Sequence, residues 1–162
     1  MKKDKLFSVN DWAESYDKHL INKAWFGPEI MFGLMYEFIK PNETILDLGI
    51  GTGLSSIPFK RFGLKIYGID SSEKMLELCK SKNIAESLCS ADFGNKEVDC
   101  FKGKTFDHVI SHAVFHIIGN LENIFSTTAG YLKQGGYFAF TYEGLSAIAD
   151  ESFKKSETEG MY

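Results

Sequence analysis

Two aspartates flank a glycine-rich segment in the first half of the chain. The segment Asp47-Leu48-Gly49-Ile50-Gly51-Thr52-Gly53 follows a short apolar run, and Asp70 stands about 20 residues after Gly51. Glycine lets the backbone turn sharply after a strand and lets a ligand approach it closely. A carboxylate at this spacing can accept hydrogen bonds from both hydroxyls of a ribose. The pattern therefore predicts a site for a nucleoside-containing ligand.

Two ligand classes fit such a site, a dinucleotide and S-adenosylmethionine. A dinucleotide site calls for glycine or alanine at the position that Leu54 occupies. The charge of Asp47 opposes a pyrophosphate but suits a sulfonium ligand that carries an ammonium group. We therefore favour S-adenosylmethionine, and a nucleotide-dependent oxidoreductase is the weaker alternative.

Alternating strands and helices are expected to position these residues. Hydrophobic periodicity, capping residues and Gly or Pro breaks define them. We expect strands at 44–48, 65–70, 86–89, 106–111 and 137–141. We expect helices at 10–21, 28–39, 54–62, from Ser71 or Ser72 onward, and 121–132, with a turn at Gly135-Gly136.

The alternation predicts an α/β domain with a parallel sheet and right-handed crossovers. Ligands on such sheets bind at the carboxyl ends of the strands. Asp47, Asp70, Asp92 and Ser111 all fall at or near those ends. The helix at 28–39 is expected to turn one apolar face to the core, formed by Ile30, Met31, Leu34, Met35 and Phe38.

Five ordered segments resemble the motifs of class I S-adenosylmethionine-dependent methyltransferases. The glycine segment with its preceding strand resembles motif I, and Tyr67–Leu76 resembles the motif that follows it. The others are Ser90–Phe93, then Phe106–Ser111 with Val114-Phe115-His116, and Leu132–Phe138, where Gln134 replaces the usual proline. The resemblance covers about residues 11–142. It implies a Rossmann-like sheet of order 3-2-1-4-5, with helices on both faces and an N-terminal helical cap.

The resemblance also implies roles for individual residues. Asp47 would hold the amino group of S-adenosylmethionine, and Gly49, Gly51 and Gly53 would lie under its methionine and ribose portions. Asp70 would accept the ribose hydroxyls, with Ser71 and Met75 in the same motif. The remaining donor-site residues would be Asp92 and Phe93 at the adenine, Ser111 at the methionine end, and Tyr16 closing over the ligand.

Several of these residues also fit purely structural roles. Asp92 could end a strand, Phe93 could pack in the core, and Ser111 could bond to its own backbone. Tyr16 fits packing of its helix somewhat better than ligand contact. These alternatives stay open.

Three histidines, His108, His112 and His116, are spaced by four residues. Because His108 falls in a predicted strand, they cannot share a helical face, so we expect no metal site. His116 and His112 are the candidate catalytic residues. Either could position a methyl acceptor or take a proton from it, because histidine titrates near neutral pH. Ordinary packing or loop roles fit both histidines equally well.

Composition narrows the cellular context and the partners. The net charge is -4, and the 18 basic residues form no cluster, so nucleic acid is not an expected partner. No segment reads as a signal peptide or a membrane span. The odd cysteine count without a Cys-x-x-Cys pair favours three reduced thiols. We therefore expect a cytoplasmic methyltransferase that acts on a small molecule and releases S-adenosylhomocysteine.

The chain is expected to form one domain over residues 1–162, with a helical lid (1–40), a donor-binding core (41–142) and a polar tail (143–162). The family usually adds two strands beyond strand five, for which the tail is too short. A truncated form, a second chain or a folded-back tail would each explain this. We favour a truncated form, with a homodimer through the exposed edge of strand five. The alternative function is a non-catalytic domain that binds S-adenosylmethionine or S-adenosylhomocysteine and acts through a partner.

Overall fold

A computed structural model describes residues 15–20, 25–92, 98–118 and 121–142. In these residues five parallel strands form one sheet of order β3-β2-β1-β4-β5. The strands are β1 (Thr44–Leu48), β2 (Lys65–Asp70), β3 (Ser87–Ser90), β4 (Phe106–Ser111) and β5 (Leu132–Phe140). The predicted fold class and strand order are confirmed. The division into lid, core and tail stays a prediction, and residues 143–162 lie outside the described residues.

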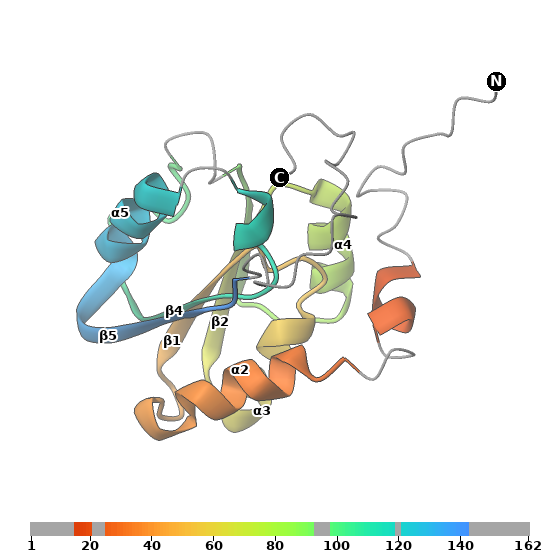
Figure 1. Ribbon diagram of the computed structural model, residues 1–162, viewed down its shortest axis with the longest axis horizontal. Helices are drawn as coiled ribbons and strands as arrows, with labels where there is room; N and C mark the ends of the chain where they lie inside the picture. The colour runs from red at the N-terminus through yellow and green to blue at the C-terminus, as the bar shows by residue number, and fades with distance from the viewer. Residues whose placement is uncertain (1–14, 21–24, 93–97, 119–120, 143–162) are drawn as a thin grey trace, which may run out of the picture.

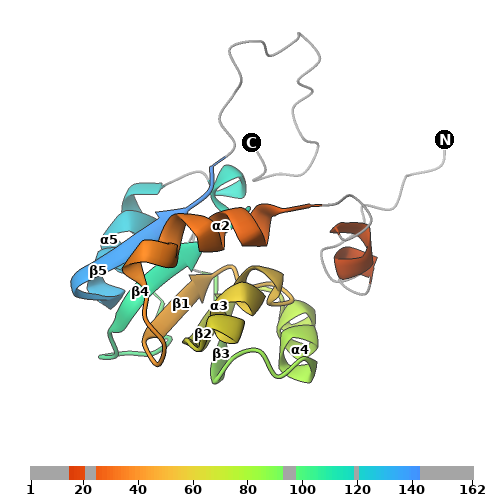
Figure 2. The ribbon, with the colours of Figure 1, turned by 90° about the horizontal axis from the view of Figure 1, so that it is seen from below.

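Helices cover both faces of the sheet (Figures 1 and 2). α2 and α3 lie on one face, and α5 lies on the other. The helical elements are α2 (Gly27–Met35), η1 (Tyr36–Phe38), η2 (Leu54–Ser56), α3 (Ile57–Phe62), α4 (Glu73–Ser81), η3 (Phe115–Ile117) and α5 (Leu121–Tyr131). Residues 15–20 are also helical and agree with the helix expected at 10–21, whose other residues are not described. Among the described residues, no helix is long and apolar enough to cross a membrane.

Each face of the sheet has its own apolar core. On one face Met31 and Met35 of α2 and Phe59 of α3 pack on Ile45 and Ile110. On the other face Tyr131 of α5 packs with a second cluster, which includes Leu46, Leu48, Phe106 and Val109. The sheet is thus buried on both sides, as parallel sheets require.

The ends of the helices follow local signals. Ser72 caps α4, because its hydroxyl accepts a hydrogen bond from the Met75 amide at 3.3 Å. Gly63 ends α3 in the left-handed conformation, with a φ of +105°. These positions agree with the sequence analysis.

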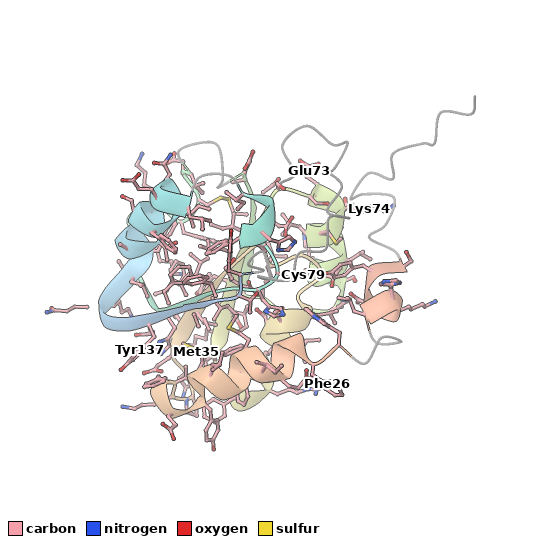
Figure 3. All side chains as sticks on the ribbon, in the orientation of Figure 1. Phe26, Met35, Glu73, Lys74, Cys79 and Tyr137 are labelled. Carbon is pink, nitrogen blue, oxygen red and sulfur yellow. A yellow bond between two sulfur atoms is a disulfide. The ribbon has the colours of Figure 1, made fainter. Side chains whose placement is uncertain are left out.

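The helix expected at 28–39 is shorter and less buried than predicted. α2 ends at Met35, η1 follows, and Ile39 is extended ahead of Pro41. Within the predicted apolar face, Met31 and Met35 are buried, whereas Ile30, Leu34 and Phe38 are exposed. Figure 3 labels Phe26 and Met35 near the two ends of this helix. The helix lies on the sheet along one narrow stripe, so only part of its apolar surface reaches the core.

β5 begins earlier than the sequence indicates. α5 ends at Tyr131, and Leu132 already pairs with Phe106. The next pairing joins His108 to Tyr137, so residues 133–136 form an irregularity within the strand. Gly135, with a φ of +82°, lies in this irregularity. The predicted turn is therefore part of β5, and the expected separation of helix, turn and strand at 132–137 is wrong.

The expectation of three reduced cysteines is also wrong. Cys89 at β3 and Cys100 form a disulfide, and their Cα atoms are 6.0 Å apart. Cys79 is free and buried. The pairing could not be read from cysteine spacing, because it depends on where the chain returns to β3 after residue 92. The cytoplasmic location stays a prediction, and disulfides are more frequent in oxidising compartments.

Candidate functional site

The glycine segment forms a tight turn between β1 and η2, at the carboxyl end of the sheet. The amides of Gly49 and Ile50 both donate to the carbonyl of Ile69 in β2, at 2.8 and 3.1 Å. Gly51 and Gly53 have φ angles of +53° and +87°, which favour glycine. The turn is thus fixed to the neighbouring strand.

The three glycines have different surroundings. A side chain at Gly49 would collide with Val114, and one at Gly53 would collide with Ile84 and Cys79. A Cβ at Gly51 would meet no atom within 4 Å. Gly49 and Gly53 therefore serve packing inside the protein, whereas Gly51 faces open space among the described residues. That space is where a ligand could approach the backbone.

Asp70 ends β2 and is bonded to the glycine segment. Its Oδ2 accepts from the Gly51 amide at 2.7 Å, and its Oδ1 accepts from the Ser72 amide at 2.8 Å. Burial raises its pKa, although backbone hydrogen bonds from Ser72, Gly51 and Ser71 oppose this shift. Each carboxylate oxygen can accept a further hydrogen bond. Asp70 is thus oriented by the backbone and can still receive hydroxyl donors.

Asp47 lies in β1 and is fully buried. Its Oδ2 accepts from the Ser56 hydroxyl at 2.7 Å, but its Oδ1 has no hydrogen-bond partner among the described residues. Burial raises its pKa to about 7, the Ser56 hydrogen bond opposes the shift, and the charge of Asp70 adds to it. A buried carboxylate oxygen without a donor is costly. It is the kind of group that a cationic ligand would satisfy.

The helix at residues 15–20 contacts the glycine segment. Asp17 accepts from the Thr52 hydroxyl at 2.6 Å and pairs with Lys82 at the end of α4. The pKa of Tyr16 is raised by burial, then by the charges of Asp17 and Asp70. Tyr16 is therefore close enough to Asp70 to sense its charge. Sequence reasoning selected Tyr16 but missed Asp17, whose partners are distant in sequence.

Three other predicted residues surround this centre. The Ser111 hydroxyl donates to the carbonyl of Leu48 at 2.8 Å, so it joins the ends of β4 and β1 rather than bonding to its own backbone. Met75 is buried on α4. Ser71 is exposed and donates its amide to Asp70. All three lie at the carboxyl end of the sheet.

The predicted adenine contacts are only partly described. Asp92 is exposed and follows β3, whose Ser90 pairs with Asp70 in β2. Phe93 lies outside the described residues. The role of both residues stays a prediction.

His112 follows β4 and contacts one polar and one aromatic residue. Its Nδ1 lies 3.1 Å from the Thr141 hydroxyl, and its ring centroid is 4.8 Å from that of Trp25. Burial lowers its pKa, and its buried Nε2 has no hydrogen-bond partner among the described residues. His112 therefore favours the neutral form, in which one ring nitrogen can accept a proton.

His116 lies in η3, and its buried Nδ1 likewise finds no hydrogen-bond partner in the part of the chain that the structure describes. His108 is buried in β4 and pairs with Glu43 at 3.0 Å, at the other end of the strand. Among the described residues no group of three His, Cys, Asp or Glu side chains could hold a metal ion.

The arrangement fits a ligand with a ribose and an ammonium group. Asp70 offers acceptor positions beside the open space at Gly51, and Asp47 offers an oxygen that lacks a donor. S-adenosylmethionine carries both groups, whereas a pyrophosphate would meet two carboxylates. The residues present therefore fit the donor better than a dinucleotide.

Comparison with known proteins agrees with this geometry. Residues 46–140 match the family described as a methyltransferase domain. A demethylmenaquinone methyltransferase of Tropheryma whipplei is 29% identical over 103 residues, which are 60% of this chain and 41% of that protein. A ribosomal protein L11 methyltransferase of Staphylococcus aureus is 31% identical over 121 residues, or 68% of this chain and 37% of that protein. The chain thus spans less than half the length of these relatives.

Solved structures share the fold. One is a chain in the complex between the Haloferax volcanii Trm112 methyltransferase activator and a methyltransferase. It has a TM-score of 0.67 and 21% identity, covering 86% of this chain and 61% of that chain. Another is an S-adenosylmethionine-dependent methyltransferase from Clostridium acetobutylicum, with a TM-score of 0.61 and 21% identity, covering 81% and 56%.

Proposed function

The chain belongs to the class I S-adenosylmethionine-dependent methyltransferases, and we propose that it binds S-adenosylmethionine and transfers its methyl group to a small molecule. The observation that carries the proposal is the pair of acids around Gly51, of which Asp47 is buried and Asp70 is partly buried. Asp70 is oriented by the Gly51 and Ser72 amides, and no described residue donates to the second oxygen of Asp47. Structural residues rarely leave such a group unsatisfied.

In this proposal the two acids bind opposite parts of the donor. Asp47 Oδ1 accepts from the ammonium group, which relieves the cost of its burial. Asp70 accepts from the ribose hydroxyls. Gly51 gives access to the backbone, while Gly49 and Gly53 shape the turn by packing on Val114, Ile84 and Cys79. Figure 3 labels Cys79 on α4.

The remaining predicted residues complete the donor site in the same proposal. They are Ser71 and Met75 beside the ribose, Asp92 and Phe93 at the adenine, Ser111 at the methionine end, and Tyr16 over the ligand. Ser111 acts with its remaining acceptor capacity, because its hydroxyl hydrogen is directed to Leu48. The burial of Tyr16 near Asp70 supports its place in the site.

The bound donor supplies an activated methyl group, which a nucleophile accepts by in-line displacement. The chain's own residues orient the reactants and exclude water. His112 takes a proton from an acceptor that must lose one, since burial keeps its pKa low and Thr141 fixes one ring nitrogen. His116 is the second candidate for this role, because its Nδ1 also lacks a partner.

The acceptor is the least constrained part of the proposal. The two relatives are named for a demethylmenaquinone and for a ribosomal protein. We favour a small molecule because the histidine that would face the acceptor, His112, contacts the ring of Trp25 in a partly buried setting. Screening radiolabelled methyl transfer against metabolite pools and against ribosomal protein tests this choice. Label found only in the protein fraction would contradict it.

A second candidate function is a non-catalytic donor-binding domain that acts through a partner. The outer edge of β5 has no partner strand among the described residues, and Tyr137 and Phe140 on this strand are exposed. Such an edge can pair with another chain, and we propose a homodimer through it. Sedimentation equilibrium tests the dimer. Donor binding without methyl transfer to any pool would favour the non-catalytic function.

Calorimetry with S-adenosylmethionine, S-adenosylhomocysteine and NAD tests the main proposal. We expect both sulfur ligands to bind and NAD not to bind. Asp70→Ala should abolish binding of both ligands, because it removes the ribose acceptors and frees the Gly51 amide. The matched control is Asp99→Ala, an exposed acid that pairs with Lys102 in a surface contact away from the glycine segment. Binding of NAD alone, or unchanged affinity in Asp70→Ala, would contradict the proposal.

A further inference from the structure

Three segments far apart in sequence meet in one polar network. Asp17, on the helix at 15–20, accepts from the Thr52 hydroxyl with its Oδ1 at 2.6 Å. Its Oδ2 pairs with the ammonium group of Lys82, which also donates to the Thr52 carbonyl at 3.0 Å. Each of the three residues thus contacts the other two. The helix, the glycine segment and the end of α4 are joined by this Asp17–Thr52–Lys82 network.

The network is partly shielded from solvent. Thr52 is 1% exposed, and the side chains of Asp17 and Lys82 are 27% and 28% exposed. Hydrogen bonds between charged groups are stronger than neutral ones, and a pair that is only partly shielded is still weakened by added salt. Figures 1 and 2 both show the short helix beside α4. The contact therefore fixes this helix against the rest of the domain.

Two residues of the network, Thr52 and Asp17, each adjoin a residue of the proposed donor site. Thr52 follows Gly51, whose amide holds Asp70. Tyr16 precedes Asp17 and senses the charge of Asp70. A change in the position of Asp17 would therefore move Tyr16 relative to Asp70, and a change at Thr52 would move the turn that carries Gly51.

We propose that Asp17 and Lys82 are positioning residues for the donor. Through their contacts with Thr52 they fix the helix that carries Tyr16 over the glycine segment, and this helix holds the bound donor in place. The inference rests on the proposed donor binding. It assigns no contact between the ligand and Asp17 or Lys82. Its consequence is kinetic, because a helix that covers a bound ligand must move before the ligand leaves.

The test measures the dissociation rate of S-adenosylhomocysteine by stopped-flow displacement. Asp17→Asn and Lys82→Met should each release the ligand about tenfold faster, the loss expected for one charge-assisted hydrogen bond. The double variant should be no faster than either single variant, because both disrupt one network. Lys80→Met, which replaces an exposed lysine in the last turn of α4, is the matched control and should leave the rate unchanged.

A second pair of variants separates positioning from folding. Thr52→Ser keeps the hydroxyl, so the dissociation rate of S-adenosylhomocysteine should stay at the wild-type value. Thr52→Val lacks the hydroxyl and should release the ligand faster. The wild-type rate should also rise with added NaCl, and that of Asp17→Asn should not. Thermal unfolding shows whether each variant is folded. A merely structural network would lower the unfolding temperature without changing the release rate of the folded protein.

The outcomes distinguish the two proposals. If the wild type binds neither sulfur ligand, the proposed function is wrong and this inference falls with it. If the wild type binds but folded Asp17→Asn, Lys82→Met and Thr52→Val release the ligand at the wild-type rate, the donor-binding proposal stands. The positioning role of Asp17 and Lys82 is then wrong.

Discussion

Asp47 and Asp107 stand near opposite ends of adjacent strands of the sheet, and their pKa values shift in opposite directions. Asp107, near the start of β4, accepts from the amide and hydroxyl of Thr44 at 2.8 and 2.7 Å and from Lys133 at 2.7 Å. Partial burial raises its pKa, but the bonds from Lys133 and Thr44 outweigh this and lower it to about 2. Burial instead raises the pKa of Asp47 to about 7, with one oxygen left without a donor.

The difference separates a residue that stabilises the fold from one that is available to a ligand. At the amino end of the sheet the protein supplies donors to both carboxylate oxygens of Asp107, so its charge favours the folded state. At the carboxyl end the charge of Asp47 disfavours the folded state until something cationic binds. A group that weakens the free protein is expected where function requires it.

The largest effect should come from Asp47→Asn. At pH 8 the rise in the pKa of Asp47 from 3.8 to about 7 corresponds to a loss of about 4 kcal/mol in the free energy of unfolding. The amide avoids the buried charge but leaves its own donor unsatisfied. We therefore expect the free energy of unfolding in urea to rise by about 2 kcal/mol. The same variant should bind S-adenosylhomocysteine about 100-fold more weakly. Asp99→Asn is the control. An Asp47→Asn variant less stable than the wild type would contradict the view that the charge of Asp47 destabilises the free protein.

The pH dependence of donor affinity tests whether Asp47 binds the ammonium group of the donor. Below about pH 7 the free protein keeps a proton on Asp47, whereas an ammonium group requires the carboxylate. Affinity for S-adenosylmethionine should therefore fall up to about tenfold per pH unit as the pH drops from 7 to 5.5. Calorimetry in two buffers of different ionisation enthalpy should show proton release at pH 6. The dependence should largely vanish in Asp47→Asn, and a flat wild-type profile would contradict the assignment.

A smaller effect should come from Asp107→Asn, at the other end of the sheet. Its side chain is 25% exposed, so the lowered pKa translates to a loss of about 1–2 kcal/mol in the free energy of unfolding. The stabilisation by Asp107 is present above pH 4 and is lost as the pH falls towards 2. Donor affinity should stay within about twofold of wild type. A large loss of donor affinity would mean that the two ends of the sheet are coupled.

Lys133→Met serves as the companion to this variant. Lys133 is 46% exposed, so removing it should cost less than about 1 kcal/mol. A greater loss than in Asp107→Asn would show that Lys133 has a role apart from Asp107.

The sequence predicted the centre of the site because that centre is local. The glycines fix one turn, and Asp70 is joined to the turn by a single strand–helix–strand unit, so spacing alone brings Asp70 to Gly51. The alternation of strands and helices likewise predicted a parallel sheet with right-handed crossovers. The order of the strands was implied by the resemblance of the motifs to the family. Asp47 was predicted as a ligand contact, but the oxygen without a donor became visible only when Ser56 and the core were in place.

Contacts between distant segments could not be predicted in this way. The Asp17–Thr52–Lys82 network joins three elements, and the Cys89–Cys100 disulfide spans a loop whose path the spacing does not fix. The Thr141 bond to His112 depends on the register of β5, which the irregularity at 133–136 resets. The exposure of Ile30 and Leu34 depends on how α2 lies on the sheet.

The sequence by itself determined the fold class and the positions of the glycine turn and Asp70, because short-range geometry and periodicity fix these features, and the resemblance of its motifs implied the strand order. Tertiary structure alone decided which acid is satisfied and which is not. That distinction depends on burial and on donors contributed by other elements, and neither is encoded in the spacing of residues along the chain.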